Sequence, residues 1–335
     1  MAQERRSSID PYGFERPDDF DHSTYEDFMA SYLSILARRA KKWEDLLDAK
    51  KNVKKGYKVK RYVRKGIPRK HRGTIWMAVS GGQELKDQTP DLYSSLLSGP
   101  KISELIDTIE LDIPRTFPDN IYFKNSPDGK RQLLFNVLVA FAHQNQNVGY
   151  CQGLNYIAGI LLLITEDEEI TFWLLRILVE NILPDYYTKE MIGLRTDLEV
   201  FSELVKIKVP DVYNHMKLHN VAWAIVITKW FICLYAEVLP IETVLRIWDC
   251  LFYEGSKILF RVGITMIIKN KEKILKARNF SEIAEVFKGI TQESVVIECH
   301  SFMQAIFTET GSFSSSLIRR LREECRTRVT EQSTT

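Results

Sequence analysis

Residues 131–163 read RQLLFNVLVAFAHQNQNVGYCQGLNYIAGILLL, two apolar stretches on either side of the polar turn QNQNVGY. The apolar residues of the first stretch recur every three or four positions, as they do on one face of a helix. They are Leu134, Val137, Leu138 and Phe141. The second stretch, which runs from Gln152 to Leu163, is apolar along nearly its whole length. The sequence therefore predicts two apolar helices joined by a turn.

Helical patterns continue on both sides of this pair. Residues 109–130 contain three prolines and little periodicity, which predicts an irregular loop, and Thr165 is the expected cap of the next helix. Further helices are expected over 25–49, 72–79, 170–182, 199–208, 220–236, 241–253, 262–277, 280–288 and 314–328. No alternating β pattern persists, and glycine (16) and proline (11) are sparse in 335 residues. We therefore predict an all-α fold, as one multi-helix domain or two packed helical halves.

The ends of the chain differ in pattern from its middle. Residues 1–24 are polar and contain no apolar stretch, which predicts a flexible lead and no signal peptide. Residues 276–328 are expected to form C-terminal helices that pack on the domain, and 329–335 a disordered tail. The helix at 25–49 should pack against its own domain through one face. That face carries Met29, Leu33, Leu36, Ala40, Trp43 and Leu47.

A basic segment follows the first helix. Residues 50–72 hold 12 Lys and Arg and no Asp or Glu, so the formal net charge of +2 leaves −10 on the rest of the chain. This asymmetry predicts one basic surface on an acidic body. A solvated linker into the domain is the favoured interpretation, and contact with an anionic membrane surface comes second. Tyr57 and Tyr62 between the charges would also suit nucleic acid, which we place last and do not expect as a partner.

Composition and missing motifs exclude several classes of protein. A hydrophobic share of 45% and a charged share of 27% are typical of a soluble globular chain. Five cysteines without a CxxC pair argue against a zinc site or a disulfide framework and favour a cytoplasmic location. No phosphate loop, GxGxxG, HExxH or GxSxG motif occurs, so we expect no cofactor and no metal site. Lys229 and Glu237 interrupt the apolar stretch 221–239, which favours buried helices over a membrane span.

Two short segments carry chemistry. The first is IELDIPRTFP, residues 109–118, in which Pro114 and Pro118 should hold the residues before them extended and fix Arg115 in a stiff, non-helical loop. Asp112 could hydrogen-bond the guanidinium and set its direction. The alternative is an Arg–Asp ion pair that only closes the loop, and for this segment taken alone the alternative is favoured.

The second segment is YCQGLN, residues 150–155, where Gln152 stands at the start of a strongly apolar helix. Gly149 and Gly153 allow a close approach of the backbone. The alternative is a glutamine that only caps the helix. The helix and loop between the two segments are long enough to bring Arg115 and Gln152 to the same end.

Together the segments resemble the IxxDxxR and YxQG signatures of the TBC domain family of Rab GTPase-activating proteins. The matches are Ile109, Asp112 and Arg115, then Tyr150, Gln152 and Gly153. The resemblance covers residues 66–275 and includes the motifs GIPRKHRGTIW at 66–76 and RIWD at 246–249. Residues 25–65, which precede it, are the N-terminal helix and basic segment. It implies a multi-helix TBC domain of two packed helical halves.

The same resemblance implies how the chain would act. Arg115 would supply positive charge and Gln152 would orient water, both in trans, on a Rab-family small GTPase in its GTP form. Asp112, Tyr150, Gly153 and Asn155 would support them, while GTP and Mg²⁺ would belong to the partner. The implied setting is vesicle trafficking, in the cytoplasm with peripheral membrane contact.

Two rival functions remain open at this point. One is a non-catalytic helical adaptor or effector that binds a GTP-loaded Rab and leaves hydrolysis unchanged. The other is a membrane-associating scaffold built on the helix at 25–49. Intact Arg115 and Gln152 favour the activator over the adaptor, and deletion of residues 1–60 would test the scaffold.

Overall fold

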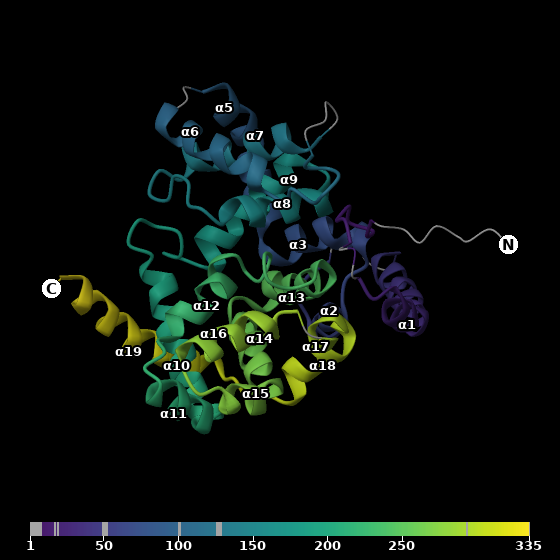
Figure 1. Ribbon diagram of the computed structural model, residues 1–335. Helices are drawn as coiled ribbons and strands as arrows, with labels where there is room; N and C mark the ends of the chain where they lie inside the picture. The colour runs from purple at the N-terminus through teal and green to yellow at the C-terminus, as the bar shows by residue number, and fades with distance from the viewer. Residues whose placement is uncertain are drawn as a thin grey trace. The chain divides into compact units, whose positions relative to one another are not determined.

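The computed structural model describes residues 9–16, 18, 20–48, 53–99, 102–124, 129–292 and 294–334. Throughout these residues the regular structure is helical, with isolated β-bridges and no strand. The chain divides into two compact helical units (Figure 1). The first unit comprises Met1–Tyr62 and Gly66–Leu175, and the second comprises Val63–Lys65 and Arg176–Thr335. The prediction of an all-α fold with two helical halves is confirmed.

The first unit is built around two long apolar helices. Its elements are α1 (His22–Asp48), α2 (Tyr57–Lys65), η1 (Arg69–His71), α3 (Arg72–Ser80), α4 (Gly82–Gln88), α5 (Leu92–Ser98), α6 (Ser103–Asp112), η2 (Ile113–Arg115), α7 (Arg131–Gln144), α8 (Leu154–Thr165) and α9 (Glu168–Ile177). Helices α5, α6 and α8 pack against α7, and α3 packs against α8. Leu138 of α7 and Leu161 of α8 are fully buried, so the helix pair predicted from 131–163 forms the core of this unit.

Helix α1 buries a face that is shifted by about one position from the predicted one and shares Trp43 with it. Leu33, expected on the packed face, is 58% exposed, whereas Tyr32, Arg39, Trp43 and Leu46 are buried. The reason is Arg39, whose guanidinium hydrogen-bonds the Tyr32 hydroxyl at 3.1 Å and stacks on its ring. The predicted face contained apolar residues only, whereas a stacked arginine can also lie against the domain. The buried face that includes Arg39 therefore lies about one position away from the predicted face.

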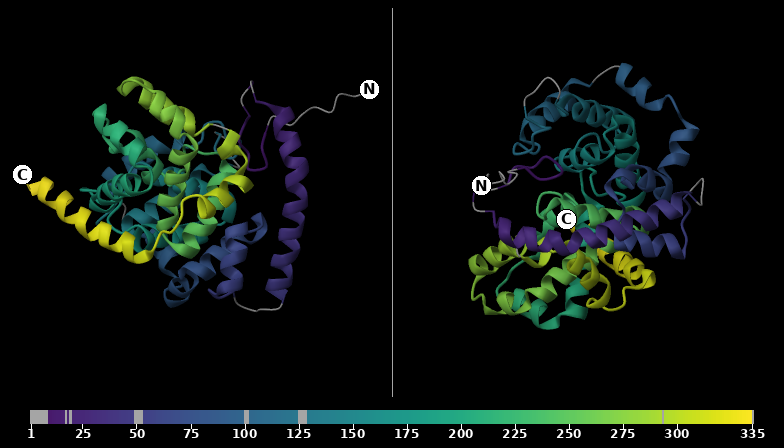
Figure 2. Two further views of the ribbon diagram at one scale, coloured as in Figure 1. Left: turned by 90° about the horizontal axis from the view of Figure 1, so that it is seen from below. Right: turned by 90° about the vertical axis from the view of Figure 1, so that its right-hand side faces the viewer.

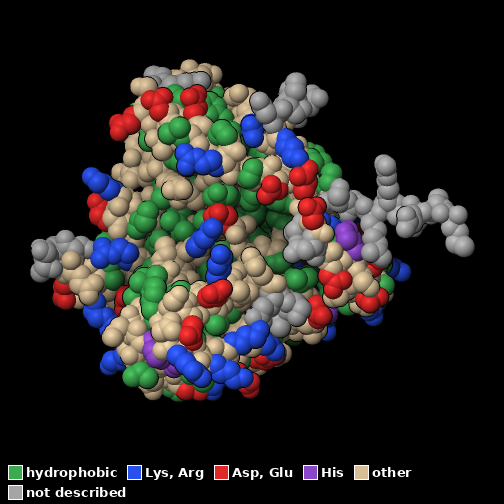
Figure 3. Space-filling model, viewed as in Figure 1, with side chains coloured by type: hydrophobic (Ala, Val, Ile, Leu, Met, Phe, Trp, Pro, Cys, Tyr) green, Lys and Arg blue, Asp and Glu red, His purple; other side chains and the backbone are tan. Residues whose placement is uncertain are grey.

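The basic segment is helical, which differs from the favoured interpretation as a linker. Residues 57–65 form α2, and Val59 and Val63 on it are buried. Lys70 of η1 forms an ion pair with Glu44 at 2.7 Å. Figure 3 shows basic and acidic side chains interspersed on the face in view. Lys50 to Asn52 of this segment lie outside the described residues.

Residues 9–16 are held against the first unit, although the sequence predicts a flexible lead over 1–24. Tyr12 is buried, the backbone N–H of Glu15 donates to Asp119 O at 2.8 Å, and that of Ile121 donates to Gly13 O at 2.9 Å. We refer to residues 9–16 as the N-terminal strap. The part of the predicted lead before residue 9 lies outside the described residues.

The second unit is a helical array of its own. Its elements are the π-helix η3 (Leu178–Ile182), α10 (Ile192–Lys208), α11 (Pro210–Leu218), α12 (Trp223–Ile232), α13 (Ile241–Glu254), α14 (Lys257–Lys269), α15 (Lys271–Lys276), α16 (Phe280–Ile290), α17 (Ser294–Ile297), α18 (Cys299–Thr308) and α19 (Ser315–Thr334). Helix α13 is buried along nearly its whole length, with Trp248 at its centre. The last helix continues to Thr334, where the sequence predicts a disordered tail from 329, and Val329 on it is buried.

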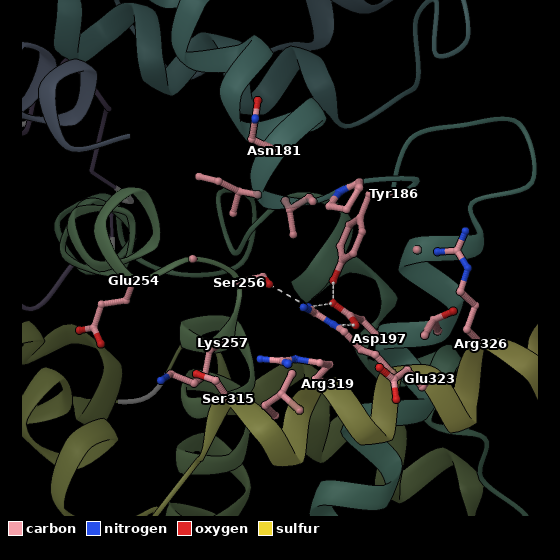
Figure 4. A pocket seen from close by; sticks show the side chains of 18 residues that line it. Asn181, Tyr186, Asp197, Glu254, Ser256, Lys257, Ser315, Arg319, Glu323 and Arg326 are labelled. Carbon is pink, nitrogen blue, oxygen red and sulfur yellow. Dashed lines mark hydrogen bonds and ion pairs between the residues drawn. The ribbon is translucent and has the colours of Figure 1, made fainter. Parts of the chain in front are cut away.

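An ion pair links helix α19, the yellow helix at the C-terminus in Figure 2, to helix α10 (Figure 4). Arg322 forms a bidentate ion pair with Asp197, at 2.7 Å from Nε and 2.6 Å from Nη2, and the Tyr186 hydroxyl donates to the same carboxylate. Ser256 accepts another hydrogen bond from Arg322. These groups line a cavity of about 560 Å³ in the second unit. The ion pair between Arg322 and Asp197 joins residues more than a hundred positions apart and holds the C-terminal helix against α10.

We expect Arg322→Met to destabilise the second unit by about 3 kcal/mol, because the Asp197 side chain is only 2% exposed and would be left charged and unpaired. Arg326→Met, one turn further along α19, is the matched control. Its ion pair with Asp185 is open to solvent on both sides and should contribute below about 1 kcal/mol. Urea denaturation followed by circular dichroism measures both, and equal losses would contradict this account.

The cysteines and the apolar stretch at 221–239 agree with the sequence analysis. All five cysteines are free thiols. The stretch folds as α12 followed by turns, with Trp230, Phe231 and Leu234 buried in the second unit. Among the described residues no helix has the length and apolar character needed to cross a membrane.

Candidate functional site

Arg115 ends the short 3-10 helix η2, which continues directly from α6. The predicted loop at 109–130 is therefore helical in its first part. Ile113 has φ −53° and ψ −51°, so it is helical and not extended, because Pro114 fits the first turn of a 3-10 helix without a clash. Phe117, also predicted to be extended, has φ +50°. The turn at Arg115 combines the helical geometry of η2 with the positive φ of Phe117, two residues later.

The Arg115 side chain points into solvent. It is 63% exposed, its Nε donates to the Leu111 carbonyl at 3.0 Å, and its Nη1 lies 3.9 Å from Asp112 Oδ1. The contact with Asp112 is at the outer distance limit of an ion pair, so it is weak and leaves the positive charge of the guanidinium accessible to another molecule. Most of the guanidinium donors remain available to another molecule.

Gln152 occupies the turn before α8. The next residue, Gly153, precedes the first turn of that helix with φ +109°, a conformation that side chains other than glycine rarely adopt. Gln152 is exposed, and its side chain makes no hydrogen bond to any described residue. The alternative interpretation of Gln152 as a helix cap therefore has no contact to support it.

Two hydrogen bonds join the turn that carries Arg115 to the turn that carries Gln152. The Tyr150 hydroxyl donates to Asp112 Oδ2 at 2.7 Å. The Asn155 amide donates to Thr116 Oγ1 at 2.8 Å, and its carbonyl oxygen accepts from the Gly153 N–H at 3.0 Å. These bonds link Asp112 and Thr116, on either side of the turn at Arg115, to Tyr150 and Asn155, on either side of Gln152.

The sequence analysis did not predict the part played by three residues at or beside these two turns, namely Thr116, Phe117 and Gly159. Thr116 is fully buried and also donates to the Asp112 carbonyl at 2.8 Å. Gly159 of α8 faces the same turn, and a Cβ there would lie 3.0 Å from the Phe117 ring and 3.3 Å from the Thr116 methyl. A glycine inside a very apolar helix was the available signal, since it often marks close contact with another segment.

Burial sets the protonation of two side chains beside Gln152. It raises the pKa of Tyr150 far above its usual range, and the hydrogen bond to Asp112 adds to this effect. Tyr150 therefore remains a hydroxyl donor at every physiological pH. Burial also raises the pKa of Cys151 to about 11, so its thiol is protonated near neutral pH and is a poor nucleophile.

Asn155→Ala should lower the free energy of unfolding by about 1–3 kcal/mol, because it leaves the buried Gly153 N–H without an acceptor and removes the donor to the buried Thr116 hydroxyl oxygen. Asn136→Ala on α7 is the matched control, since Asn136 bonds the side chains of Gln132 and Glu168 near the surface. Its cost should stay below about 1 kcal/mol. Thermal unfolding of both variants tests the difference, and a larger loss for Asn136→Ala would contradict it.

The arrangement offers a guanidinium and a carboxamide to a partner molecule. The guanidinium can stabilise negative charge, and the carboxamide can orient a water molecule through its donor and acceptor ends. Both groups are exposed, and the backbone beneath them is fixed by buried hydrogen bonds. Within the described residues no group of three or more His, Cys, Asp or Glu could hold a metal ion.

Comparison with known proteins gives consistent matches. The model of the Rab-GTPase-TBC domain matches residues 69–275. Growth hormone-regulated TBC protein 1 from human is 53% identical over 325 residues, which cover 97% of this chain and 96% of that protein. Growth hormone-regulated TBC protein 1-A from zebrafish is 52% identical over 329 residues, covering 98% of this chain and 92% of the relative.

Solved structures share the fold. The crystal structure of the Chlamydomonas flagellar RabGAP TBC domain superposes with a TM-score of 0.77 at 31% identity, over 91% of this chain and all of that one. The Ypt/Rab-GAP domain of Gyp1p gives a TM-score of 0.69 at 21% identity, over 82% of this chain and 98% of that domain, and supports the fold alone.

Proposed function

The chain belongs to the Rab-GTPase-TBC domain family, and on this premise we propose that it accelerates GTP hydrolysis on a Rab-family GTPase in its GTP-bound form. The observation that carries the proposal is the pair of exposed side chains, Arg115 and Gln152, on turns joined by buried hydrogen bonds. A group that acts on another protein has to be both accessible and pre-organised, and this pair meets both conditions.

The proposed roles follow from the chemistry of phosphoryl transfer. Hydrolysis by a small GTPase is slow because little stabilises the charge that accumulates on the transferring phosphoryl group. The Arg115 guanidinium would hydrogen-bond the phosphoryl oxygens, an effect on the order of 10³–10⁵ in rate. The Gln152 carboxamide would hold the attacking water in line. GTP and Mg²⁺ would be bound by the GTPase, and this chain would contribute side chains only.

The test is phosphate release from a panel of GTP-loaded Rab proteins at substoichiometric amounts of this chain. We expect at least one Rab to hydrolyse GTP many times faster, with turnover of the added protein. A chain that binds GTP-loaded Rabs but changes no rate would instead be an adaptor or effector, which is the alternative function. Strong stimulation of GTPases outside the Rab family, with none of Rabs, would also contradict the proposal.

We further propose a cytoplasmic protein that makes peripheral contact with anionic membranes through residues 50–72. Lys54, Lys55, Lys58 and Arg61 are exposed around α2, and each basic residue near such a surface adds about 1 kcal/mol of attraction. Sedimentation with vesicles that contain or lack phosphatidylserine, over a range of salt, tests this contact. Binding that persists without the anionic lipid would contradict it.

A further inference from the structure

We propose that the N-terminal strap, residues 9–16, is a positioning element for Arg115, which it holds in place through the Phe117 ring. The proposal rests on the function proposed above. It assigns a role in the reaction to a segment that precedes the matched domain at 69–275 and contains neither Arg115 nor Gln152.

The strap pairs with the segment that follows Arg115. The Glu15 N–H donates to Asp119 O at 2.8 Å, and the Ile121 N–H donates to Gly13 O at 2.9 Å. The buried Asn120 amide adds a hydrogen bond to the Tyr12 carbonyl at 3.1 Å. The Asp119 carbonyl, the Ile121 N–H and the Asn120 side chain thus find their partners on the strap, and the loss is costly at Asn120, which is fully buried.

The strap is itself anchored to the body of the first unit. The Tyr12 hydroxyl accepts from the buried Arg72 side chain at 3.1 Å, and the Arg69 guanidinium stacks on the Tyr12 ring at 4.8 Å. Arg69 also donates to the Pro11 carbonyl at 2.5 Å. Through these contacts the strap connects α3 and η1 to the segment beyond Arg115.

Phe117 is where the strap meets the candidate site. Its ring contacts Phe14 of the strap edge-on at 5.2 Å, Tyr156 of α8 at 5.4 Å and Phe123 at 5.9 Å. Gly159 gives the ring room on the α8 side. Phe117 therefore lies between the strap and α8, two residues after Arg115.

The backbone of Phe117 needs this packing. Its φ of +50° is unfavourable for a bulky residue, by about 1–3 kcal/mol, and persists only where the surroundings enforce it. Without Phe14 one wall of the ring's site is missing, and Phe117 can relax toward negative φ. That rotation would turn the backbone of Thr116 and with it the direction of Arg115. Small misplacements of a catalytic group can cost on the order of 10²-fold in rate.

Two variants remove the strap's effect without touching Arg115. Phe14→Ala deletes the ring contact. Gly13→Val disrupts the pairing, because Gly13 has φ +93° and a Cβ there would lie 2.6 Å from the Tyr122 ring. The matched controls are Tyr57→Ala, a highly exposed aromatic residue on α2, and Gly56→Val, where a Cβ meets nothing within 4 Å.

The assay is steady-state GTP hydrolysis on the most responsive Rab, with the full chain at substoichiometric amounts. We expect Phe14→Ala and Gly13→Val to lower kcat by about 10–100-fold with KM within about twofold of the wild type, and both controls to match the wild type. In an Arg115→Ala background the strap variants should cause no further loss, because the group that they position is absent. An unchanged or increased kcat, or an equal further loss in that background, would overturn the positioning role.

Hydrogen exchange of the free protein separates this inference from the proposed function. Phe14→Ala should increase amide exchange over 116–123 and leave α7 unchanged, with no GTPase present. If no Rab responds to the wild type, the proposed function fails while the exchange result still reports on the strap. Unchanged exchange over 116–123 would overturn the inference even where the wild type stimulates hydrolysis.

Discussion

Replacing Arg115 with lysine is expected to remove nearly all stimulation of GTP hydrolysis, a loss of about 10³-fold or more in the single-turnover rate at saturating protein. Lysine keeps the positive charge but cannot donate to two phosphoryl oxygens in the plane of a guanidinium. The fold should be unaffected, because the Arg115 side chain is 63% exposed and makes its one hydrogen bond to a carbonyl one helical turn earlier. Arg115→Ala should behave in the same way.

Arg38→Lys on α1 is the matched control for this substitution. Its Nε donates to the Ser34 carbonyl, four residues earlier, just as the Arg115 Nε donates to the Leu111 carbonyl, and Arg38 is also exposed. It should retain full stimulation. Near-full activity of Arg115→Lys, or an equal loss in both variants, would show that Arg115 has no special role in hydrolysis.

Gln152→Ala is expected to lower the stimulated rate by about 10²–10³-fold, the usual loss when one oriented polar group is removed from a transition state. The Gln152 side chain is exposed and makes no hydrogen bond to any described residue, so its removal should leave the thermal stability unchanged. Gln132→Ala on α7 is the control, because Gln132 is an exposed glutamine whose amide bonds Asn136 on the same helix.

A second arm identifies which protein provides the glutamine. A Rab whose own active-site glutamine is replaced by alanine should still be stimulated by the wild-type chain, and only weakly by Gln152→Ala. If loss of the GTPase glutamine alone abolishes stimulation, Gln152 does not orient the water.

The sequence predicted the helical elements that are governed by local periodicity. The pair α7 and α8 follows directly from the apolar residues of 131–163, and α3, expected over 72–79, ends at Ser80, just before Gly81 with its φ of +90°. It failed at α17 and α18, which were not predicted and are only four and ten residues long. Asp167, and not the predicted Thr165, caps α9, with its carboxylate accepting from the Ile170 N–H at 2.9 Å.

The sequence pointed to the residues of the candidate site, but it did not predict the backbone conformation and packing around them. Arg115 and Gln152 were identified from their motifs, but the turn at Arg115 was expected to be extended, since proline restricts its neighbours only statistically. The Phe117 ring, at a φ of +50°, packs against Phe14, Tyr156 and Gly159, which are distant in sequence. The strap has no periodicity that could reveal its pairing with 119–121. Contacts of this kind depend on the folded arrangement and leave no local pattern.

Complex formation with a transition-state analogue tests the central claim most directly. GDP with aluminium fluoride imitates the transferring phosphoryl group, and such analogues bind far more tightly than the ground state. With the most responsive Rab loaded with GDP, the wild-type chain should form a complex on gel filtration only when aluminium fluoride is present, and Arg115→Ala and Gln152→Ala should not. A complex of equal strength with both variants, or one that needs no aluminium fluoride, would contradict the claim that these two side chains act at the γ-phosphate of another protein.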